Sequence, residues 1–295
     1  MSKINSIIGR QVFDSRGIPT IEAEIILDNG IRASAITPSG ASTGSYEAYE
    51  LRDGDQKKFL GKSVMNGIQN INTKILKSLK NQNINDQKKI DQIMIDLDGT
   101  ENKKNLGANA ILAVSLSAAK TSAKLNNKNL YELFGKDFSM PYPLMNILNG
   151  GAHADNNLRI QEFMIRPDSS INFKDAISKC FIVIQNLKKL LKSKKLQTNV
   201  GDEGGFAPSI NTNEDALDLI IESINMSNLL PDKDISICLD VAANELFDKK
   251  GNYSVKSDSF TTADETLQYY NELTSKYPIK SIEDPFAEDD WDSWI

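Results

Sequence analysis

Two adjacent carboxylates, Asp202 and Glu203, lie in a short stretch that contains three glycines and ends in a proline. From Val200 the sequence reads VGDEGGFAP. Glycine tolerates positive φ angles and lets a ligand approach the backbone closely, so a loop of this composition exposes its acidic side chains. Such a loop could present carboxylates to a substrate or a metal ion, and the simpler alternative is an acidic turn in solvent.

Three further acidic residues mark the ends of apolar stretches. Glu162 lies near the start of one stretch, and Asp240 and Glu283 directly follow two others. Carboxylates that share a cleft repel one another and raise one another's pKa, and a bound cation offsets this repulsion. Because carboxylate oxygens favour Mg²⁺ over zinc, we expect a site for a hard divalent cation if these acids and Glu203 converge. Each acid taken alone is equally consistent with an ion pair or a helix cap.

The first part of the chain predicts a strand hairpin followed by helices. Residues 21–27 alternate between apolar and polar, Asp28, Asn29 and Gly30 form a turn sequence, and residues 31–36 are expected to be the return strand. Helical patterns are expected over residues 64–79, 86–96 and 107–124. This order indicates a small α+β domain over residues 1–140 that ends at a proline-rich linker.

The loop at residues 38–44 follows the predicted hairpin and contains glycine, serine and threonine without a bulky side chain. It is either a flexible connector or a mobile lid whose hydroxyl and carbonyl oxygens bind a hard cation.

The second part, residues 141–295, begins with two predicted strands at 144–148 and 160–165 with no helix between them. Consecutive strands joined by a short loop should be antiparallel, so the second begins where the first ends. This places Gln161 and Glu162 beside His153, the only histidine of the chain.

Helices and strands then alternate, which indicates a parallel sheet. Helices are expected at 173–191, at 213–226 and after a capping box from Thr262 to Glu265, and strands at 235–239 and 279–282. Asp240 and Glu283 therefore lie at carboxyl ends of strands, the rim that holds active sites in (β/α) barrels. A barrel has eight strands and four are visible, so we expect an incomplete barrel whose interior is lined by Ile237, Leu239 and Ile282.

Composition excludes several function classes. The chain has a net charge of −6, 40% hydrophobic residues and 25% charged residues, which argues against a nucleic-acid partner. No apolar run reaches the length of a membrane span and the first residues lack a signal-peptide core. The two cysteines are expected to be buried thiols, which fits a cytoplasmic protein.

Five motifs occur in the order and spacing typical of enolases, and the chain resembles that family from Ser2 to Ile295. The motifs are DSRG at residues 14–17, PSGASTG at 38–44, QEFMI at 161–165, GDEGG at 201–205 and SIEDP at 281–285.

The resemblance implies an α+β domain followed by an enolase-type (β/α) barrel that begins with an antiparallel strand pair. It implies a glycolytic lyase, phosphopyruvate hydratase, that interconverts 2-phosphoglycerate and phosphoenolpyruvate plus water through an enolate stabilised by Mg²⁺. A homodimer in the cytoplasm, with a possible cell-surface or secreted pool, is implied as well.

The resemblance also assigns roles to residues. Glu203 matches the donor of a proton to the leaving hydroxyl, and Glu162 matches its partner, which also contacts substrate. Gln161 and His153 match positions that contact substrate.

For the metal, Asp240 and Glu283 match two of three carboxylates that hold the first Mg²⁺, and Ser42 matches a ligand of the second. The third carboxylate, the lysine base and the phosphate-binding residues belong to family strands that follow Glu283. We therefore expect a chain that lacks the family's C-terminal part, is inactive alone and is poorly folded past Pro141.

Two rival interpretations remain. A dehydratase or racemase of another carboxylate would share the barrel, but the GDEGG and SGASTG sequences argue against it. A non-catalytic enolase fragment or a surface-binding protein would share every motif, and no residue pattern supports that binding role directly.

Overall fold

The structure is a computed structural model that describes residues 2–40, 43–248 and 250–295. The chain forms two compact units, Met1–Phe138 and Ser139–Ile295, and each has its own hydrophobic core. Ser42, the expected ligand of a second metal ion, lies outside the described residues.

The first unit is built on a three-stranded antiparallel sheet in the order β1-β2-β3. The strands are β1 (Ile4–Phe13), β2 (Pro19–Leu27) and β3 (Arg32–Ile36). The predicted hairpin of β2 and β3 is confirmed. Strand β1 was not predicted, because polar residues and Gly9 interrupt its apolar pattern. Gly9 is needed there, since a Cβ would lie 3.2 Å from the Ile71 side chain.

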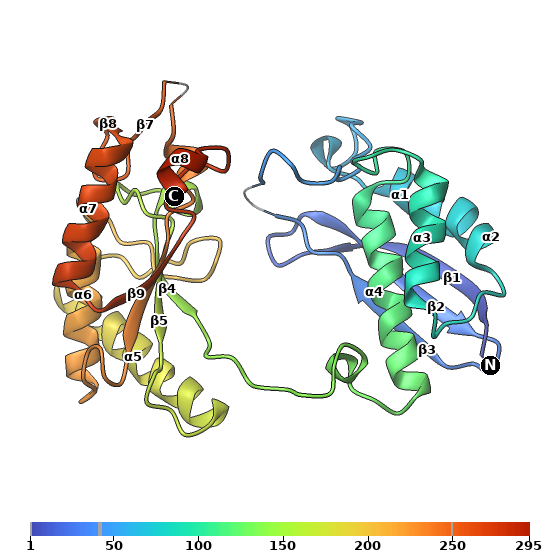
Figure 1. Ribbon diagram of the computed structural model, residues 1–295, viewed down its shortest axis with the longest axis horizontal. Helices are drawn as coiled ribbons and strands as arrows, with labels where there is room; N and C mark the ends of the chain where they lie inside the picture. Colours follow the sequence, from blue (N-terminus) through green and yellow to red (C-terminus); the bar gives the residue numbers. More distant parts are fainter. Residues whose placement is uncertain (1, 41–42, 249) are drawn as a thin grey trace. The chain divides into compact units, whose positions relative to one another are not determined.

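Helices of the first unit pack against this sheet (Figure 1). They are α1 (Met65–Asn70), a π-helical turn (Ile71–Ile75), α2 (Leu76–Leu79), α3 (Gln87–Asp98) and α4 (Ala108–Leu125). The small residues of α4 allow close approach: the hydroxyl of Ser117 accepts from the Ile25 amide at 3.1 Å and donates to the Ala33 carbonyl at 2.9 Å. The three predicted helical stretches are thus confirmed, with one π turn inside the first.

The second unit contains a four-stranded mixed sheet in the order β4-β5-β6-β9. The strands are β4 (Met145–Asn149), β5 (Glu162–Arg166), β6 (Ser236–Asp240) and β9 (Ile279–Glu283). β4 pairs antiparallel with β5 as predicted, β5 pairs antiparallel with β6, and β6 pairs parallel with β9. Only the last of these pairings is the parallel one that the helix–strand alternation indicated.

Three long helices cover one face of this sheet (Figure 1). They are α5 (Phe173–Ser193), α6 (Asn213–Met226) and α7 (Ala263–Lys276), accompanied by the short elements β7 (Asn252–Tyr253), β8 (Thr261–Thr262) and α8 (Trp291–Trp294). The predicted capping box at Thr262 and Glu265 begins α7. Within the described parts of the chain, no helix combines the length and apolar character that a membrane crossing needs.

The expected orientation of three strand residues is wrong. Ile237 and Leu239 are fully buried in the core that includes the α5 and α6 residues Leu187 and Ile220, and Ile282 packs against the same core. They face the helices rather than a barrel interior. Because side chains alternate along a strand, the neighbouring Asp240 and Glu283 point to the opposite face.

Candidate active site

Strand register brings three carboxylates to one level at one edge of the sheet. Asn149 pairs with Glu162, Glu162 with Asp240, and Asp240 with Glu283. Because β5 runs antiparallel to β4 and β6, its first residue lies beside the last residues of its neighbours. Directly paired residues carry their side chains on the same face, with strands about 4.8 Å apart. The three carboxylates therefore lie side by side, on the face away from the helices.

Burial and the charges of neighbouring carboxylates raise the pKa values of Glu162 and Asp240. The pKa of Glu162 is raised to about 7, chiefly by burial and then by the negative charges of Asp240, Glu203 and Glu283. The pKa of Asp240 is also raised, by burial and by the charge of Glu283. The carboxylates thus disfavour one another's charged forms, and a cation between them would relieve that conflict.

The glycine-rich loop carries Glu203 to the same edge. The Gly201 amide donates to the Gly205 carbonyl at 2.8 Å and the Gly204 amide donates to the Gly201 carbonyl at 3.1 Å, which closes a tight turn. The Asp202 amide donates to the His153 carbonyl at 3.2 Å. These bonds fix the loop beside the end of β4, with the Glu203 side chain 44% exposed at its tip.

Two glycines of the loop are required by close backbone approach. A Cβ at Gly201 would lie 2.5 Å from the His153 carbonyl oxygen, and a Cβ at Gly205 would lie 2.7 Å from Asn149 Oδ1. Distances this short force a displacement of the loop or of β4. The glycine pattern that suggested an exposed acidic loop therefore has a packing cause.

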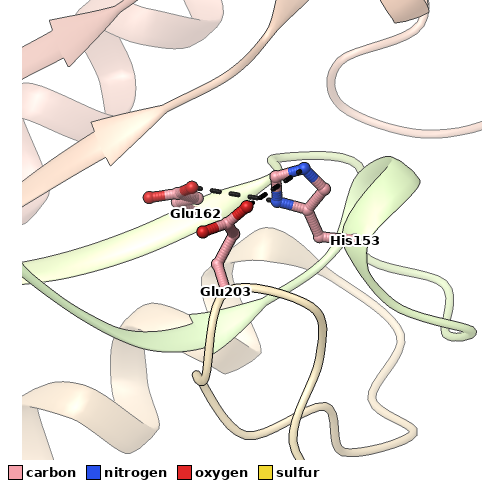
Figure 2. A group of neighbouring side chains, drawn as sticks. All are labelled: His153, Glu162 and Glu203. Carbon is pink, nitrogen blue, oxygen red and sulfur yellow. Dashed lines mark ion pairs between the residues drawn. The ribbon is translucent and has the colours of Figure 1, made fainter. Parts of the chain in front are cut away.

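His153 faces both glutamates, and the dashed lines in Figure 2 mark its ion pairs with Glu162 and Glu203. Its Nδ1 is 3.8 Å from Glu162 Oε1 and its Nε2 is 4.0 Å from Glu203 Oε1, while the imidazole is only 5% exposed. Among the described residues, neither ring nitrogen has a hydrogen-bond partner. Donor atoms of these three side chains lie within 4.8 Å of one another, so the group could hold a metal ion or a polar ligand.

Gln161 connects this cluster with the carboxylate row. Its Nε2 donates to Asp240 Oδ2 at 3.3 Å, and its backbone amide donates to the Asp240 carbonyl at 3.1 Å. The side-chain Oε1 is buried and has no hydrogen-bond partner in the described structure. It is an acceptor that remains available to a ligand.

The sequence analysis missed Asn149, a fully buried residue that joins the loop to the strands. Its Oδ1 accepts from the Gly205 amide at 2.9 Å and its Nδ2 donates to the Gln161 carbonyl at 3.3 Å. The feature that could have revealed it is an asparagine directly after an apolar strand and before Gly150 and Gly151. A buried amide that bonds two loops positions both of them.

Two donor sets are compatible with different cations. Asp240 and Glu283 offer only carboxylate oxygens on neighbouring strands, which suits a hard ion such as Mg²⁺. The set of His153, Glu162 and Glu203 includes imidazole nitrogen, which suits softer transition metals. The donor chemistry of the Asp240 and Glu283 pair therefore fits the expected Mg²⁺.

Comparison with known proteins identifies the family. The family models "Enolase, N-terminal domain" and "Enolase, C-terminal TIM barrel domain" match residues 4–134 and 137–295. The chain belongs to the enolase family of lyases, which confirms the resemblance and the predicted fold class. It is 60% identical to "Enolase" from Pelagibacter ubique (strain HTCC1062) over 296 residues, which cover 100% of this chain and 70% of that relative.

Replacing Gly201 by alanine should damage the site through packing. The added Cβ would overlap the His153 carbonyl and lie 2.9 Å from Asn149 Cβ, so we expect a loss of about 1–3 kcal/mol in unfolding free energy. Urea unfolding of the natural protein measures this loss. Gly135→Ala is the control, because its nearest contact would be an ordinary 3.6 Å. Equal stability of the two variants would contradict the packing argument.

Removing the carboxylate of Glu162 should stabilise the metal-free protein at high pH. The pKa of Glu162 is about 7 in the folded state and 4.5 ordinarily. A raised folded pKa contributes stability that is complete below pH 4.5 and is lost as pH rises through 7. Each pKa unit corresponds to about 1.36 kcal/mol, and partial solvent screening reduces the total, so we expect Glu162→Gln to gain about 1–3 kcal/mol at pH 8.

Urea unfolding in a chelator, at pH 5 and at pH 8, measures this difference. Glu272→Gln, at an exposed position of α7, is the matched control and should show no such pH-dependent gain. An equal gain for Glu162→Gln at both pH values would show that the buried negative charge of Glu162 is not the cause.

Proposed function

We propose that the natural protein catalyses the interconversion of 2-phosphoglycerate and phosphoenolpyruvate plus water, as its family implies. The observation that supports the proposal is the register that places Glu162, Asp240 and Glu283 side by side on adjacent strands. These carboxylates combine a cation site with groups that can transfer protons. The reaction removes a proton next to a carboxylate and expels hydroxide from the adjacent carbon. It therefore needs positive charge at the carboxylate and an acid at the leaving group.

We assign Asp240 and Glu283 as ligands of Mg²⁺. The Asp240 carboxylate is oriented by the Ala242 amide, which donates to Oδ1 at 3.0 Å, and by Gln161. When bound, the ion would supply positive charge that offsets the negative charge developing on the substrate carboxylate.

Glu203 and Glu162 are proposed to supply the proton that the leaving hydroxyl takes up. A carboxyl with a pKa near 7 is protonated about half of the time at neutral pH, which is the optimum for proton transfer. The raised pKa belongs to Glu162, and Glu203 approaches within 4.8 Å of it from the exposed side. Glu203 would thus donate the proton to the hydroxyl. Glu162 would then pass a proton to Glu203 and so restore the acid.

His153 and Gln161 are proposed to orient the substrate. The ring nitrogens of His153 and the Oε1 of Gln161 are buried polar atoms without hydrogen-bond partners in the described chain. Buried polar atoms are costly unless satisfied, so a polar ligand that satisfies them gains both affinity and orientation. For the natural protein we propose the cytoplasmic location and the homodimer that the family implies.

Replacing Glu203 by glutamine should separate two chemical steps. Glu203→Gln keeps the shape of the side chain but cannot donate a proton, so phosphoenolpyruvate hydration should fall by about 100- to 10,000-fold, the usual contribution of general acid catalysis. Exchange of the α-proton of 2-phosphoglycerate in deuterated buffer should persist, because a different group removes that proton. Absorbance of phosphoenolpyruvate and NMR of exchange measure the two steps. Loss of exchange equal to loss of hydration would refute the assigned role.

A polypeptide limited to residues 1–295 should not turn over 2-phosphoglycerate. The described strand-end site consists of carboxylates, one amide and one imidazole, and includes no lysine to remove the α-proton. Strand β9 lies at the end of the sheet order with Lys280, Ser281 and Glu283 exposed, and unpaired edges promote association.

Activity with saturating Mg²⁺ and limited proteolysis test this expectation. Turnover near the typical enzyme value of about 10 s⁻¹, or a protease-resistant core that extends to Ile295, would show the expectation to be wrong.

A further inference from the structure

Two buried tyrosines bind the backbone that follows Glu283. Tyr270, 4% exposed on α7, donates its hydroxyl to the Pro285 carbonyl at 2.7 Å. Tyr253, fully buried on β7, accepts from the Ala287 amide at 3.1 Å and donates to Asp290 Oδ2 at 2.6 Å. Both hydroxyls thus hold one short segment, residues 285–290, although the tyrosines belong to different elements.

Phe286 belongs to the same segment, and its ring packs against both tyrosine rings. Its centroid lies 5.4 Å from that of Tyr253 and 5.8 Å from that of Tyr270, and both contacts are edge-to-face. Phe286 is 5% exposed. Edge-to-face contacts favour defined ring orientations, so the segment is fixed by packing as well as by hydrogen bonds.

Two backbone hydrogen bonds directly before this segment join the ends of β6 and β9, which carry Asp240 and Glu283. The Val241 amide donates to the Glu283 carbonyl at 3.0 Å, and the Ala243 amide donates to the Asp284 carbonyl at 3.1 Å. Ala242 and Asp284 have φ values of 49° and 44°, a left-handed conformation that costs energy in residues with a Cβ. Such conformations persist only when surrounding contacts enforce them. The tyrosine contacts provide that constraint on the Glu283 side.

We propose that Tyr253 and Tyr270 are positioning residues that hold Glu283 against Asp240 and thereby set the affinity of this cation site. The inference rests on the proposed function, because it takes Asp240 and Glu283 as ligands of one ion. Neither tyrosine touches substrate or metal in this scheme. Each acts through residues 285–287, which determine where β9 ends and where the Glu283 carboxylate points.

Removing each hydroxyl in the natural protein tests the proposal. Tyr253→Phe and Tyr270→Phe retain the rings that pack on Phe286. Each should weaken Mg²⁺ binding by about 2- to 10-fold, the range of one net hydrogen bond, and the double variant more than either. Isothermal titration with Mg²⁺ and electron paramagnetic resonance with Mn²⁺ measure affinity without turnover. In assays, the Mg²⁺ concentration for half-maximal activity should rise while kcat at saturation stays near its original value.

Tyr277→Phe is the matched control. Tyr277 is 5% exposed and donates to Asp218 Oδ1 at 2.7 Å, so it loses an equally short bond that joins the end of α7 to α6. The control should lower Tm to a similar extent and leave Mg²⁺ affinity unchanged. Trp294→Phe provides a second variant, because Trp294 Nε1 donates to the Ala287 carbonyl at 3.0 Å and holds the same segment from α8.

The outcomes separate the two proposals. If Tyr253→Phe and Tyr270→Phe lower Tm as Tyr277→Phe does but bind Mg²⁺ with the original affinity, the positioning role is wrong. If Asp240→Asn binds Mg²⁺ as tightly as the unaltered protein, the cation site itself is wrong. Loss of Mg²⁺ binding in Asp240→Asn, with weakened binding in the tyrosine variants and an unchanged control, supports both.

Discussion

Electrostatic repulsion among neighbouring carboxylates is the constraint on which the site depends. Glu162, Asp240 and Glu283 end up level because three strands pair in a fixed register, and their separation follows from the spacing of strands in a sheet. Folding energy from the apolar face of the same strands holds these charges together despite their repulsion. The raised pKa of Glu162 reflects burial first and this repulsion second, and the two together favour a bound cation and a carboxyl that is partly protonated at neutral pH.

The helices and the glycine-rich loop stabilise this arrangement from opposite sides. On one face, Ile237 and Leu239 are fully buried among the helices and anchor β6. On the other side, the backbone of the loop approaches β4 so closely that Gly201 and Gly205 admit no side chain. Asn149 adds two side-chain amide hydrogen bonds to the backbone bridge between Leu148 and Phe206, so the loop that carries Glu203 is joined firmly to the edge of the sheet.

The proposed site has two regions that share one residue. Asp240 and Glu283 form an all-oxygen pair suited to a hard ion, whereas His153 and Glu203 form a polar group suited to substrate and proton transfer. Glu162 lies between them, beside Asp240 in the register and 3.8 Å from His153. The pKa of Glu162, raised chiefly by burial, is therefore also coupled to the charges of both regions.

The sequence alone determined most of the long helices and strands and the residue types at their ends. The alternation of apolar and polar residues predicted the hairpin of β2 and β3. The short connection between β4 and β5 predicted that they are antiparallel, and the capping box of Thr262 and Glu265 predicted the start of α7. These features are local, because each depends on residues close together in the chain. Tertiary structure alone decided that Ile237 and Leu239 face the helices, that Asn149 joins the loop to the strands and that Glu162 titrates near pH 7. Each depends on groups distant in sequence, since burial, hydrogen bonding and repulsion act through space.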